Sequence, residues 1–258
     1  MPRDSTKKIL TVALLVCVVC SVLVSVAAIG LKKRQQQNQE EEKRKNILQI
    51  AGLYDPAKSV DQQFQKVRAA VVDLESGLFD QSIDPLKFDS RRAAAAAETS
   101  LIIPPEKDKA GIKVRSRFMD VYLVEEQSRL KQVVLPVYGK GLWSTMYGFI
   151  ALGDDLSTVT GFGFYQHGET PGLGGEIENR NWLAEWQGKK VYDHSGAVRL
   201  SVGKGVVDLS SPDAVYLIDG LSGATLTSRG VSNLILYWLG ENGYKPFLDH
   251  LRKSSEKI

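Results

Sequence analysis

The sequence predicts an α+β protein: one transmembrane helix at the N-terminus, followed by a mainly antiparallel sheet with flanking helices. Three observations lead to this prediction. An uncharged apolar run lies near the start of the chain, strand-like segments fill its middle, and helical periodicity flanks those segments on both sides. Strands that are grouped together, and do not alternate with helices, are typical of an antiparallel sheet in an α+β domain.

The first predicted element is the apolar run from Ile9 to Leu31, which has 23 residues and no charge. As a helix it would be roughly 34 Å long, enough to cross a bilayer. A cleaved signal peptide is the alternative, but the run is too long for a typical signal core, and Ala27-Ala28-Ile29 is a poor cleavage site. We therefore expect a retained transmembrane helix over 9–31, preceded by a short tail over 1–8.

Charge excludes one class of partner but does not orient the helix. The chain has a net charge of +3 from 33 basic and 30 acidic residues. Residues 1–34 hold six of the basic residues and one acidic residue, which leaves 27 basic against 29 acidic in the rest of the chain. Nucleic acid is an unexpected partner for that slightly acidic remainder. Three basic residues lie on each side of the apolar run, so the positive-inside rule does not decide its orientation.

Both cysteines, Cys17 and Cys20, lie within the apolar run. Their spacing could suggest redox or zinc chemistry, but such motifs normally need a soluble fold or further ligands. They are most simply small apolar residues on one face of a helix. The rest of the chain has no cysteine, which excludes cysteine-ligated zinc or iron–sulfur centres there. We expect no metal site in this chain.

The segment 32–58 is expected to be a polar linker or a solvated helix that extends the transmembrane helix, because its composition favours exposure. A soluble α+β domain should then occupy 59–258. Ser59 to Gln62 has the pattern of a capping box and predicts the start of a helix. Apolar residues continue at helical spacing from there, so this helix should end near Gly77.

From Ile112 onward, runs rich in Val, Tyr, Phe and Leu predict strands, and Gly or Asp separates many of them. The predicted strands are Lys113–Glu125, Leu130–Tyr138, Tyr147–Leu152, Thr158–Tyr165, Val198–Val207 and Ala214–Ile218. The predicted helices in this part are Asn181–Gln187, Thr227–Gly240 and Pro246–Lys253. The chain lacks a G-x-G-x-x-G segment after a strand, so we do not expect it to bind NADH itself.

The segment Asp219–Thr227, DGLSGATLT, is the most informative part of the chain. Gly223 and Ala224 have almost no side chain, so a bulky group could approach the backbone closely. Thr225 follows at the start of a predicted helix, where free N–H groups and the helix dipole favour phosphate. The residues alone leave two interpretations open: a helix N-cap, or a threonine that binds or is esterified by a phosphate.

Two further segments are rich in glycine. His167–Gly174, HGETPGLG, must fold as a tight loop with exposed backbone, and it could be a plain surface turn or a site for a flat ring. Gly139–Thr145, GKGLWST, is a glycine turn followed by one aromatic and two hydroxyl side chains. Its Trp143 could stack on a ring or belong to the core. His167 lacks neighbouring ligands and does not suggest a metal site.

These three segments resemble the motifs of the FMN-binding domain family, in the same order. DGLSGAT, at Asp219–Thr225, is similar to the flavinylation motif, in which FMN is attached through its phosphate to the last residue. The resemblance therefore implies covalent FMN on Thr225 within a core at about 112–240. It also implies that the cofactor site draws on residues of all three segments: Trp143, Ser144, Thr145, Glu169, Thr170, Leu173, Gly174, Ser222, Gly223 and Ala224.

Within that family, the length and the N-terminal helix resemble the C subunits of sodium-translocating NADH:quinone reductases. The resemblance implies an electron-transfer subunit without a complete active site or catalytic residues of its own, in a complex that reduces ubiquinone. Implied partners are the other subunits of the complex, including a second subunit with covalent FMN and a membrane-embedded iron–sulfur centre. A flavin transferase that uses FAD and magnesium would attach the cofactor. The implied location is the bacterial inner membrane, single-pass, with the FMN domain in the periplasm.

Three alternatives remain at this stage. The G subunit of the Rnf electron-transport complex would share the cofactor but receive electrons from a different donor. A membrane-tethered module without redox function could use the Ser/Thr loop to bind an anion. A hydrolase is the weakest alternative, because the sequence shows no Ser-His-Asp or paired-carboxylate arrangement.

Overall fold

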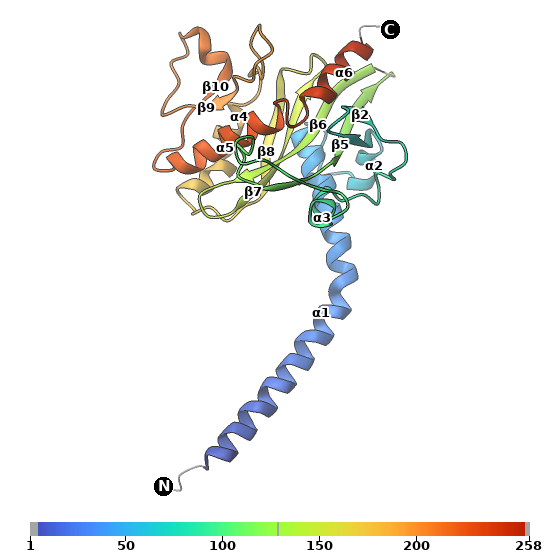
Figure 1. The fold of residues 1–258 in the computed structure, drawn as a ribbon, viewed down its shortest axis with the longest axis vertical. Helices are drawn as coiled ribbons and strands as arrows, with labels where there is room; N and C mark the ends of the chain where they lie inside the picture. The colour runs from blue at the N-terminus through green and yellow to red at the C-terminus, as the bar shows by residue number, and fades with distance from the viewer. Residues whose placement is uncertain (1–4, 128, 256–258) are drawn as a thin grey trace. The chain divides into compact units, whose positions relative to one another are not determined.

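The computed structural model describes residues 5–127 and 129–255 of the chain (Figure 1). The chain divides into two units, residues 1–45 and 46–258. The first unit consists of most of α1 (Thr6–Ile50), a single helix of 45 residues. The polar segment expected over 32–58 is therefore helical only as far as Ile50. Of the tail expected over 1–8, residues 1–4 lie outside the described residues, and the helix already begins at Thr6.

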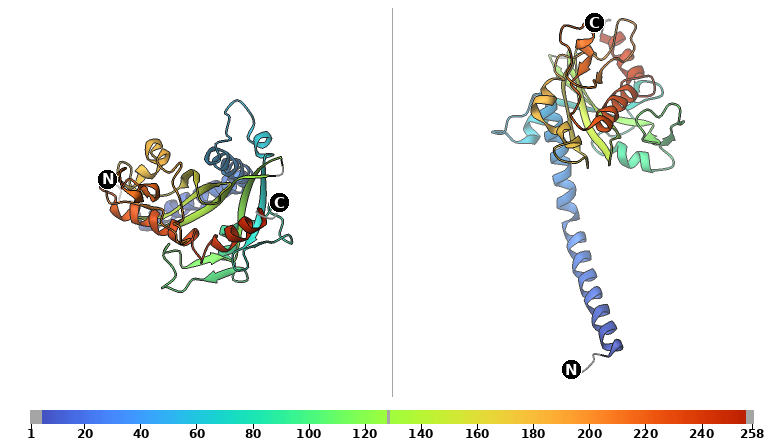
Figure 2. Two further views of the ribbon diagram at one scale, coloured as in Figure 1. Left: turned by 90° about the horizontal axis from the view of Figure 1, so that it is seen from above. Right: turned by 90° about the vertical axis from the view of Figure 1, so that its left-hand side faces the viewer.

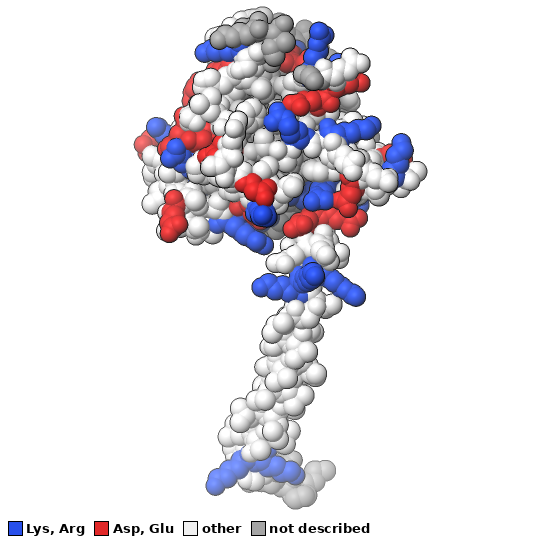
Figure 3. Space-filling view, turned by 90° about the vertical axis from the view of Figure 1, so that its right-hand side faces the viewer, with Lys and Arg blue, Asp and Glu red and all other residues white. Residues whose placement is uncertain are grey.

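The helix α1 is long and apolar enough to cross a membrane. The apolar side chains of Ile9–Leu31 are exposed along its length. Figure 3 shows this apolar stretch in white, with Lys and Arg side chains gathered at both of its ends. Apolar side chains that are exposed over more than 20 residues are unfavourable in water, which agrees with the predicted membrane span.

The second unit is built on a six-stranded sheet in which every neighbouring pair is antiparallel, as predicted. In spatial order the strands are β2 (Leu78–Phe79), β1 (Val67–Asp73), β5 (Phe118–Glu126), β6 (Arg129–Lys140), β7 (Thr145–Gly153) and β8 (Val159–Gln166). The β6–β7 pair runs from Gln132 opposite Gly153 to Lys140 opposite Thr145. A tight turn over residues 141–144 therefore lies at one end of the sheet.

Two C-terminal helices, α5 (Thr225–Trp238) and α6 (Lys245–Ser255), cover one face of the sheet (Figures 1 and 2). The larger core lies between these helices and the sheet, and it includes three tryptophans: Trp182, Trp186 and Trp238. The ring of Trp186 stacks on that of Phe162, with centroids 3.8 Å apart. These three tryptophans are therefore core residues.

The other face of the sheet holds a smaller core around the last turn of α1. Ile47 and Leu48 are fully buried there, together with side chains from β1, β5, β6 and β7. This contact depends on Gly161 of β8, because a Cβ atom at that position would collide with the carbonyl oxygen of Ile50. Gly163 likewise leaves room for the Ile50 side chain, whose Cδ1 would lie 2.9 Å from an added Cβ.

Three sequence predictions of secondary structure were wrong, and the third is described with η2 below. The helix expected from Ser59 to near Gly77 is only the short α2 (Val60–Phe64), and β1 follows it. Val67 and Val71, which fitted the helical period, instead lie in β1, which pairs with β5 and contributes side chains to the cores on both faces of the sheet. The strand expected over Val198–Val207 is reduced to β9 (Ser201–Val202), since glycines at 203 and 205 interrupt it.

The remaining elements are short. They are α3 (Ser90–Ala95), β3 (Ser100–Ile102), β4 (Val114–Ser116), η1 (Gly174–Glu178), α4 (Arg180–Ala184), η2 (Pro212–Tyr216) and β10 (Leu217–Ile218). β3 and β4 form an antiparallel pair, whereas β9 and β10 form a parallel pair. The 3₁₀ helix η2 replaces most of the strand that was predicted over Ala214–Ile218.

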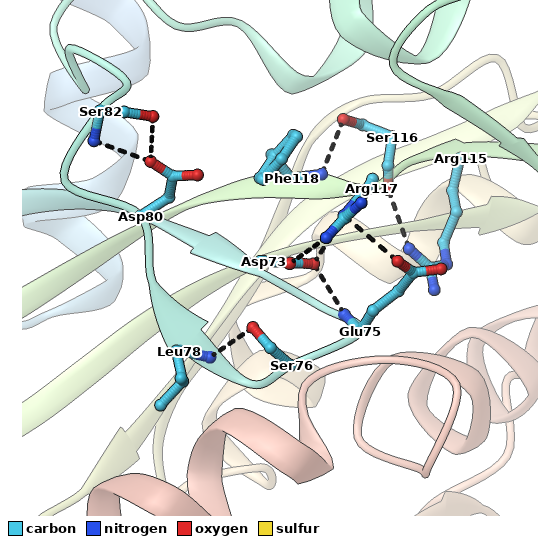
Figure 4. Close-up of polar contacts among 10 residues, drawn as sticks. All are labelled: Asp73, Glu75, Ser76, Leu78, Asp80, Ser82, Arg115, Ser116, Arg117 and Phe118. Atoms are coloured by element: carbon cyan, nitrogen blue, oxygen red, sulfur yellow. Dashed lines mark hydrogen bonds and ion pairs between the residues drawn. The ribbon is translucent and has the colours of Figure 1, made fainter.

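An ion pair fixes the end of β1 to the chain entering β5 (Figure 4). Arg117 binds the Asp73 carboxylate through two atoms, with Nη2 at 2.7 Å from Oδ2 and Nε at 3.1 Å from Oδ1. Arg117 Nε also lies 3.2 Å from Glu75 Oε2, and the Glu75 N–H donates to Asp73 Oδ1. The hydrogen bond from Arg117 holds the pKa of Asp73 below its usual value, so this carboxylate is ionised at neutral pH.

The first testable prediction concerns Gly161. We expect Gly161→Ala to destabilise the folded domain by roughly 1–3 kcal/mol, because the added methyl group forces the end of α1 away from β8. Gly153→Ala is the matched control, since its added Cβ would meet no heavy atom closer than 3.5 Å. Denaturant unfolding of the detergent-solubilised full chain measures both variants. Equal stabilities for the two variants would contradict the close contact.

The second prediction concerns Asp73. The folded-state pKa of this group is depressed, so its stabilising effect is present above the unfolded pKa of about 3.9 and is lost as pH falls through the folded value. We expect Asp73→Asn to cost roughly 1–2 kcal/mol at pH 7, allowing for the partial exposure of Arg117. The difference from wild type should shrink as pH falls below about 4. A difference that stays constant between pH 7 and pH 3 would refute the assignment.

Candidate functional site

Three segments that are far apart in the sequence meet at one end of the sheet. They are the turn over 141–144 between β6 and β7, the loop His167–Gly174 after β8, and the first turn of α5. The turn is closed by the Gly141 N–H, which donates to the Ser144 carbonyl at 2.8 Å. The three motifs singled out in the sequence are therefore brought together by the fold.

Glu169 lies where the three segments meet and is only 5% exposed. Its Oε1 accepts hydrogen bonds from the backbone N–H groups of Trp143 at 3.0 Å and Ser144 at 3.4 Å. Its Oε2 accepts from the Leu142 N–H at 3.2 Å and from the Thr227 hydroxyl at 2.6 Å. Burial raises the pKa of Glu169, but these hydrogen bonds outweigh that effect and leave the pKa below its ordinary value.

Glycines surround this carboxylate because a larger residue would not fit. A Cβ atom on Gly141 would lie 2.5 Å from Glu169 Oε1, and one on Gly174 would lie 2.6 Å from Thr227 Oγ1. Gly230 lets α5 approach β6, since its Cβ would lie 2.5 Å from the Lys140 carbonyl oxygen. The glycine content of the motifs thus reflects close packing between the segments as well as turn geometry.

Thr225 is the first residue of α5, and its side chain is exposed. The cap position is occupied by Ala224, which makes no side-chain capping bond, so Thr225 is not the N-cap. The first N–H groups of a helix have no partner within the helix. Gly223 just before the cap has φ +70°, which glycine adopts without strain. The start of α5 therefore presents a hydroxyl and backbone donors on the surface.

Asp219 has a structural role in this segment. Its Oδ1 accepts the Val207 N–H at 2.7 Å, which holds the preceding loop against the motif. Its backbone carbonyl accepts the indole N–H of Trp182 at 2.8 Å, and its own N–H donates to Glu185 Oε2 at 3.0 Å. These bonds fix the chain that leads into Thr225.

The apolar side chains expected near a flavin ring are exposed. Trp143 is 66% exposed and so is not a core residue, and Leu142 and Leu173 are also exposed. Leu173 lies close to the flavinylation-like segment, since its Cδ2 would be 3.0 Å from a Cβ on Gly223. The indole of Trp143, which belongs to the turn that Glu169 binds, is therefore exposed to solvent.

The hydroxyl residues of the motifs differ in their surroundings. Ser144 Oγ accepts the Gly168 N–H at 2.6 Å, which ties the turn to the loop. The carbonyl of Thr170 accepts the N–H groups of Leu173 and Gly175, so Thr170 shapes the loop through its backbone. Ser222 is exposed, and Thr145 begins β7 in a half-buried position.

His167 is structural in this arrangement. Its Nδ1 accepts the Glu169 N–H at 3.1 Å, and its Nε2 lies 2.8 Å from Glu178 Oε1. It therefore links the start of the loop to the last residue of η1. Among residues 5–127 and 129–255, no group of three or more His, Cys, Asp or Glu side chains is arranged to hold a metal ion.

Sequence reasoning missed Thr227, and it predicted Glu169 only as a residue that lines the ring. Thr227 is 1% exposed and its hydroxyl donates to Glu169 across 58 positions of sequence. The available signal was a hydroxyl residue on the apolar face of the helix that continues to Val231, Leu234 and Ile235. A polar residue on a buried face needs a partner, but its identity was not visible in the sequence.

Comparison with known proteins agrees with this geometry. A model of the FMN-binding domain family matches residues 141–240, which contain the turn, the loop and the start of α5. Among solved structures, NqrC of Shewanella oneidensis has a TM-score of 0.76 at 34% identity and covers 83% of this chain and 99% of that chain. The C subunit of the Na(+)-translocating NADH-quinone reductase from Parabacteroides distasonis has a TM-score of 0.66 at 27% identity and covers 84% and 96%.

Two curated relatives extend over nearly the whole chain. The C subunit of the Na(+)-translocating NADH-quinone reductase of Pseudomonas aeruginosa is 50% identical over 255 residues, covering 97% of this chain and 98% of the relative. The protein of the same name from Yersinia pestis is 45% identical over 260 residues and covers 99% and 96%. At this identity and coverage, the chain belongs to the family of the C subunits of Na(+)-translocating NADH-quinone reductases.

Proposed function

We propose that this chain is a membrane-anchored electron-transfer subunit of a sodium-translocating NADH:quinone reductase and carries FMN as a phosphoester on Thr225. The observation that carries the attachment site is the exposed Thr225 hydroxyl at the first position of α5, directly after Gly223 and Ala224. A hydroxyl at that position can be reached by a transferring enzyme, and a bulky substituent on it would meet little side-chain obstruction.

The residues around Thr225 fit a flavin phosphate. The N–H groups of the first turn of α5 and the positive end of its dipole suit a phosphodiester anion. Arg229, one turn further along the same helix, is exposed and lies on the same side as Thr225 by helical spacing. These groups would fix the phosphate without any contribution from the Glu169 carboxylate.

The exposed apolar side chains fit a flat ring. We propose that the exposed side chains of Trp143 and Leu173 contact the isoalloxazine. Thr170, which is exposed, and Gly174, which is buried, are proposed as further contacts at the edge of the ring. Ser144, Thr145 and Ser222 are proposed as contacts of the ribityl chain and phosphate. When bound, FMN supplies the electron-transfer chemistry, and the protein contributes binding and orientation.

Attachment requires a second enzyme. We propose a flavin transferase that uses FAD: the oxygen of Thr225 forms a bond to the FMN phosphorus, the bond between the two phosphates of FAD breaks, and AMP leaves with the threonine proton. We propose that the half-buried Asp219 contributes to this recognition by holding the loop shape through its bond from the Val207 N–H.

The proposed partners are other subunits of the complex, including one with a second covalent FMN, and a membrane-embedded iron–sulfur centre. A single transmembrane helix cannot form an ion channel, so sodium would pass through those partners. We further propose that the FMN domain lies in the periplasm. The relatives described above carry the name of the reductase, which favours this complex over the Rnf complex.

The third prediction tests the attachment site. Wild-type chain made together with the transferase should show a flavin-fluorescent band on a denaturing gel and a mass increase of one FMN less one water. We expect Thr225→Val to lose both, because valine has a similar shape but no hydroxyl. Thr225→Ser keeps the hydroxyl and is the matched control. A bare wild-type polypeptide, or an adduct that persists in Thr225→Val, would overturn the proposal and favour the anion-binding alternative.

The fourth prediction tests the orientation. Val206 is 90% exposed, so a Val206→Cys variant that also carries Cys17→Ser and Cys20→Ser has one accessible thiol. A membrane-impermeant maleimide that crosses only the outer membrane should label this thiol in intact cells if the domain is periplasmic. Labelling that appears only after the inner membrane is broken would place the domain in the cytoplasm.

A further inference from the structure

The hydrogen bond between Glu169 and Thr227 is not explained by contact with a cofactor. Both side chains are almost fully buried, and the bond of 2.6 Å joins the loop after β8 to the first turn of α5. Through its backbone partners, the same carboxylate also holds residues 142–144. We refer to Glu169 and Thr227 together as the Glu169–Thr227 latch.

We propose that the Glu169–Thr227 latch consists of two positioning residues that orient the Thr225 hydroxyl and the turn over 142–144 for flavin attachment. This inference rests on the proposed function, since it assigns a role to residues that do not themselves carry the flavin. It also departs from the expectation that Glu169 lines the isoalloxazine ring.

The hydrogen-bonding capacity of Glu169 supports this role. An ionised carboxylate has about four acceptor positions on its two oxygens. Three backbone N–H groups and the Thr227 hydroxyl provide four donors, two to each oxygen. Each acceptor position is therefore engaged within the chain, so Glu169 has little capacity left for a ligand.

The position of Thr227 on α5 supports it as well. Residues two apart on a helix lie about 200° apart around its axis. Thr227 is 1% exposed whereas Thr225 is exposed, so fixing the Thr227 side chain sets the rotation of the first turn and thereby the direction of the Thr225 hydroxyl. A helix terminus without a capping side chain otherwise frays readily, and Ala224 offers no cap.

The space around the latch permits little adjustment. Added Cβ atoms on Gly141 and Gly174 would lie 2.5 Å and 2.8 Å from the two Glu169 oxygens. The backbone therefore encloses the carboxylate on two sides. A shift of Glu169 would have to move the turn, the loop and the helix together. Its position therefore fixes the three segments relative to one another.

Lys140 and His167 lie on the neighbouring segments but make their hydrogen bonds to groups other than the Glu169 carboxylate. Lys140 Nζ lies 3.4 Å from the Trp143 carbonyl, so it supports the turn from its other side. His167 is directed to Glu178, and its Nδ1 accepts from the backbone of Glu169 and not from its carboxylate. The neutral Thr227 hydroxyl is thus the side-chain donor that connects α5 to Glu169.

The fifth prediction tests the latch in the flavin-free, detergent-solubilised full chain by amide hydrogen exchange. Thr227→Val removes one donor from Glu169, and we expect about tenfold faster exchange of the 142–144 amides. Glu169→Gln should have a larger effect, because its amide group turns N–H donors toward backbone N–H groups. Thr227→Ser keeps the donor and should restore the exchange rates to within about threefold of wild type.

The same variants are then supplied with FAD and the transferase. We expect the rate of flavin incorporation at Thr225 to fall about tenfold in Thr227→Val and to recover in Thr227→Ser. Thr99→Val is the matched control: it removes another threonine hydroxyl bond, to the Ala93 carbonyl at 2.7 Å, away from this site. Both the amide exchange and the incorporation rate should stay at wild-type values in this control.

The outcomes separate the latch from the flavin assignment. Wild-type amide exchange in both Thr227→Val and Glu169→Gln would overturn the latch. Faster exchange together with normal flavin incorporation would overturn its positioning role. A wild-type chain that takes up no flavin would instead refute the proposed function, while the exchange rates from the flavin-free samples would still decide whether the latch exists.

Discussion

The arrangement of the site depends on one buried carboxylate. Placing an ionised group in the interior is costly unless hydrogen bonds replace its hydration, and Glu169 receives four of them. Three of the donors are backbone N–H groups of residues 142–144. These bonds therefore constrain the backbone path of the turn, and they place less constraint on which side chains it carries. The glycines that surround the carboxylate follow from the same requirement, since a side chain at Gly141 or Gly174 would occupy the space that the oxygens need. The site is therefore preformed by the chain's own contacts.

The sheet places the segments that Glu169 connects by hydrogen bonds. The long β6–β7 pairing and the end of β8 bring the turn and the loop to the same end of the sheet. α5 reaches that end because Gly230 lets it lie directly on the backbone of Lys140. The opposite face binds the last turn of α1 through Ile47 and Leu48, so the strand that leads into the His167 loop is packed on both sides. Rigid strands and a packed helix thus hold the site, while its surface consists of turns and a helix terminus.

The antiparallel sheet, the long apolar N-terminal helix and the three motifs could be predicted from the sequence, because alternation, length and glycine-rich turns are local features. It misassigned β1, because apolar residues at Val60, Phe64, Val67 and Val71 fit a helical period equally well; pairing with β5 decides the structure, and pairing is not local. The same limit applies to the site. The motifs could be recognised, but the bond between Glu169 and Thr227 joins residues 58 positions apart and emerges only from the fold.

The exposure of the side chains expected to contact the flavin gives a physical reason for the proposed covalent attachment. Trp143 is 66% exposed and Leu173 is 46% exposed, so a ring resting on them would bury only part of its surface against this chain. Apolar burial contributes about 25 cal/mol for each Å², and a ring that is covered on one side gains correspondingly little. An enclosed pocket would hold the ring more tightly but would also keep it away from neighbouring redox centres. The phosphoester to Thr225 that we propose would avoid this conflict, since the bond would prevent loss of the cofactor while the open side of the ring stayed available to another protein of the complex.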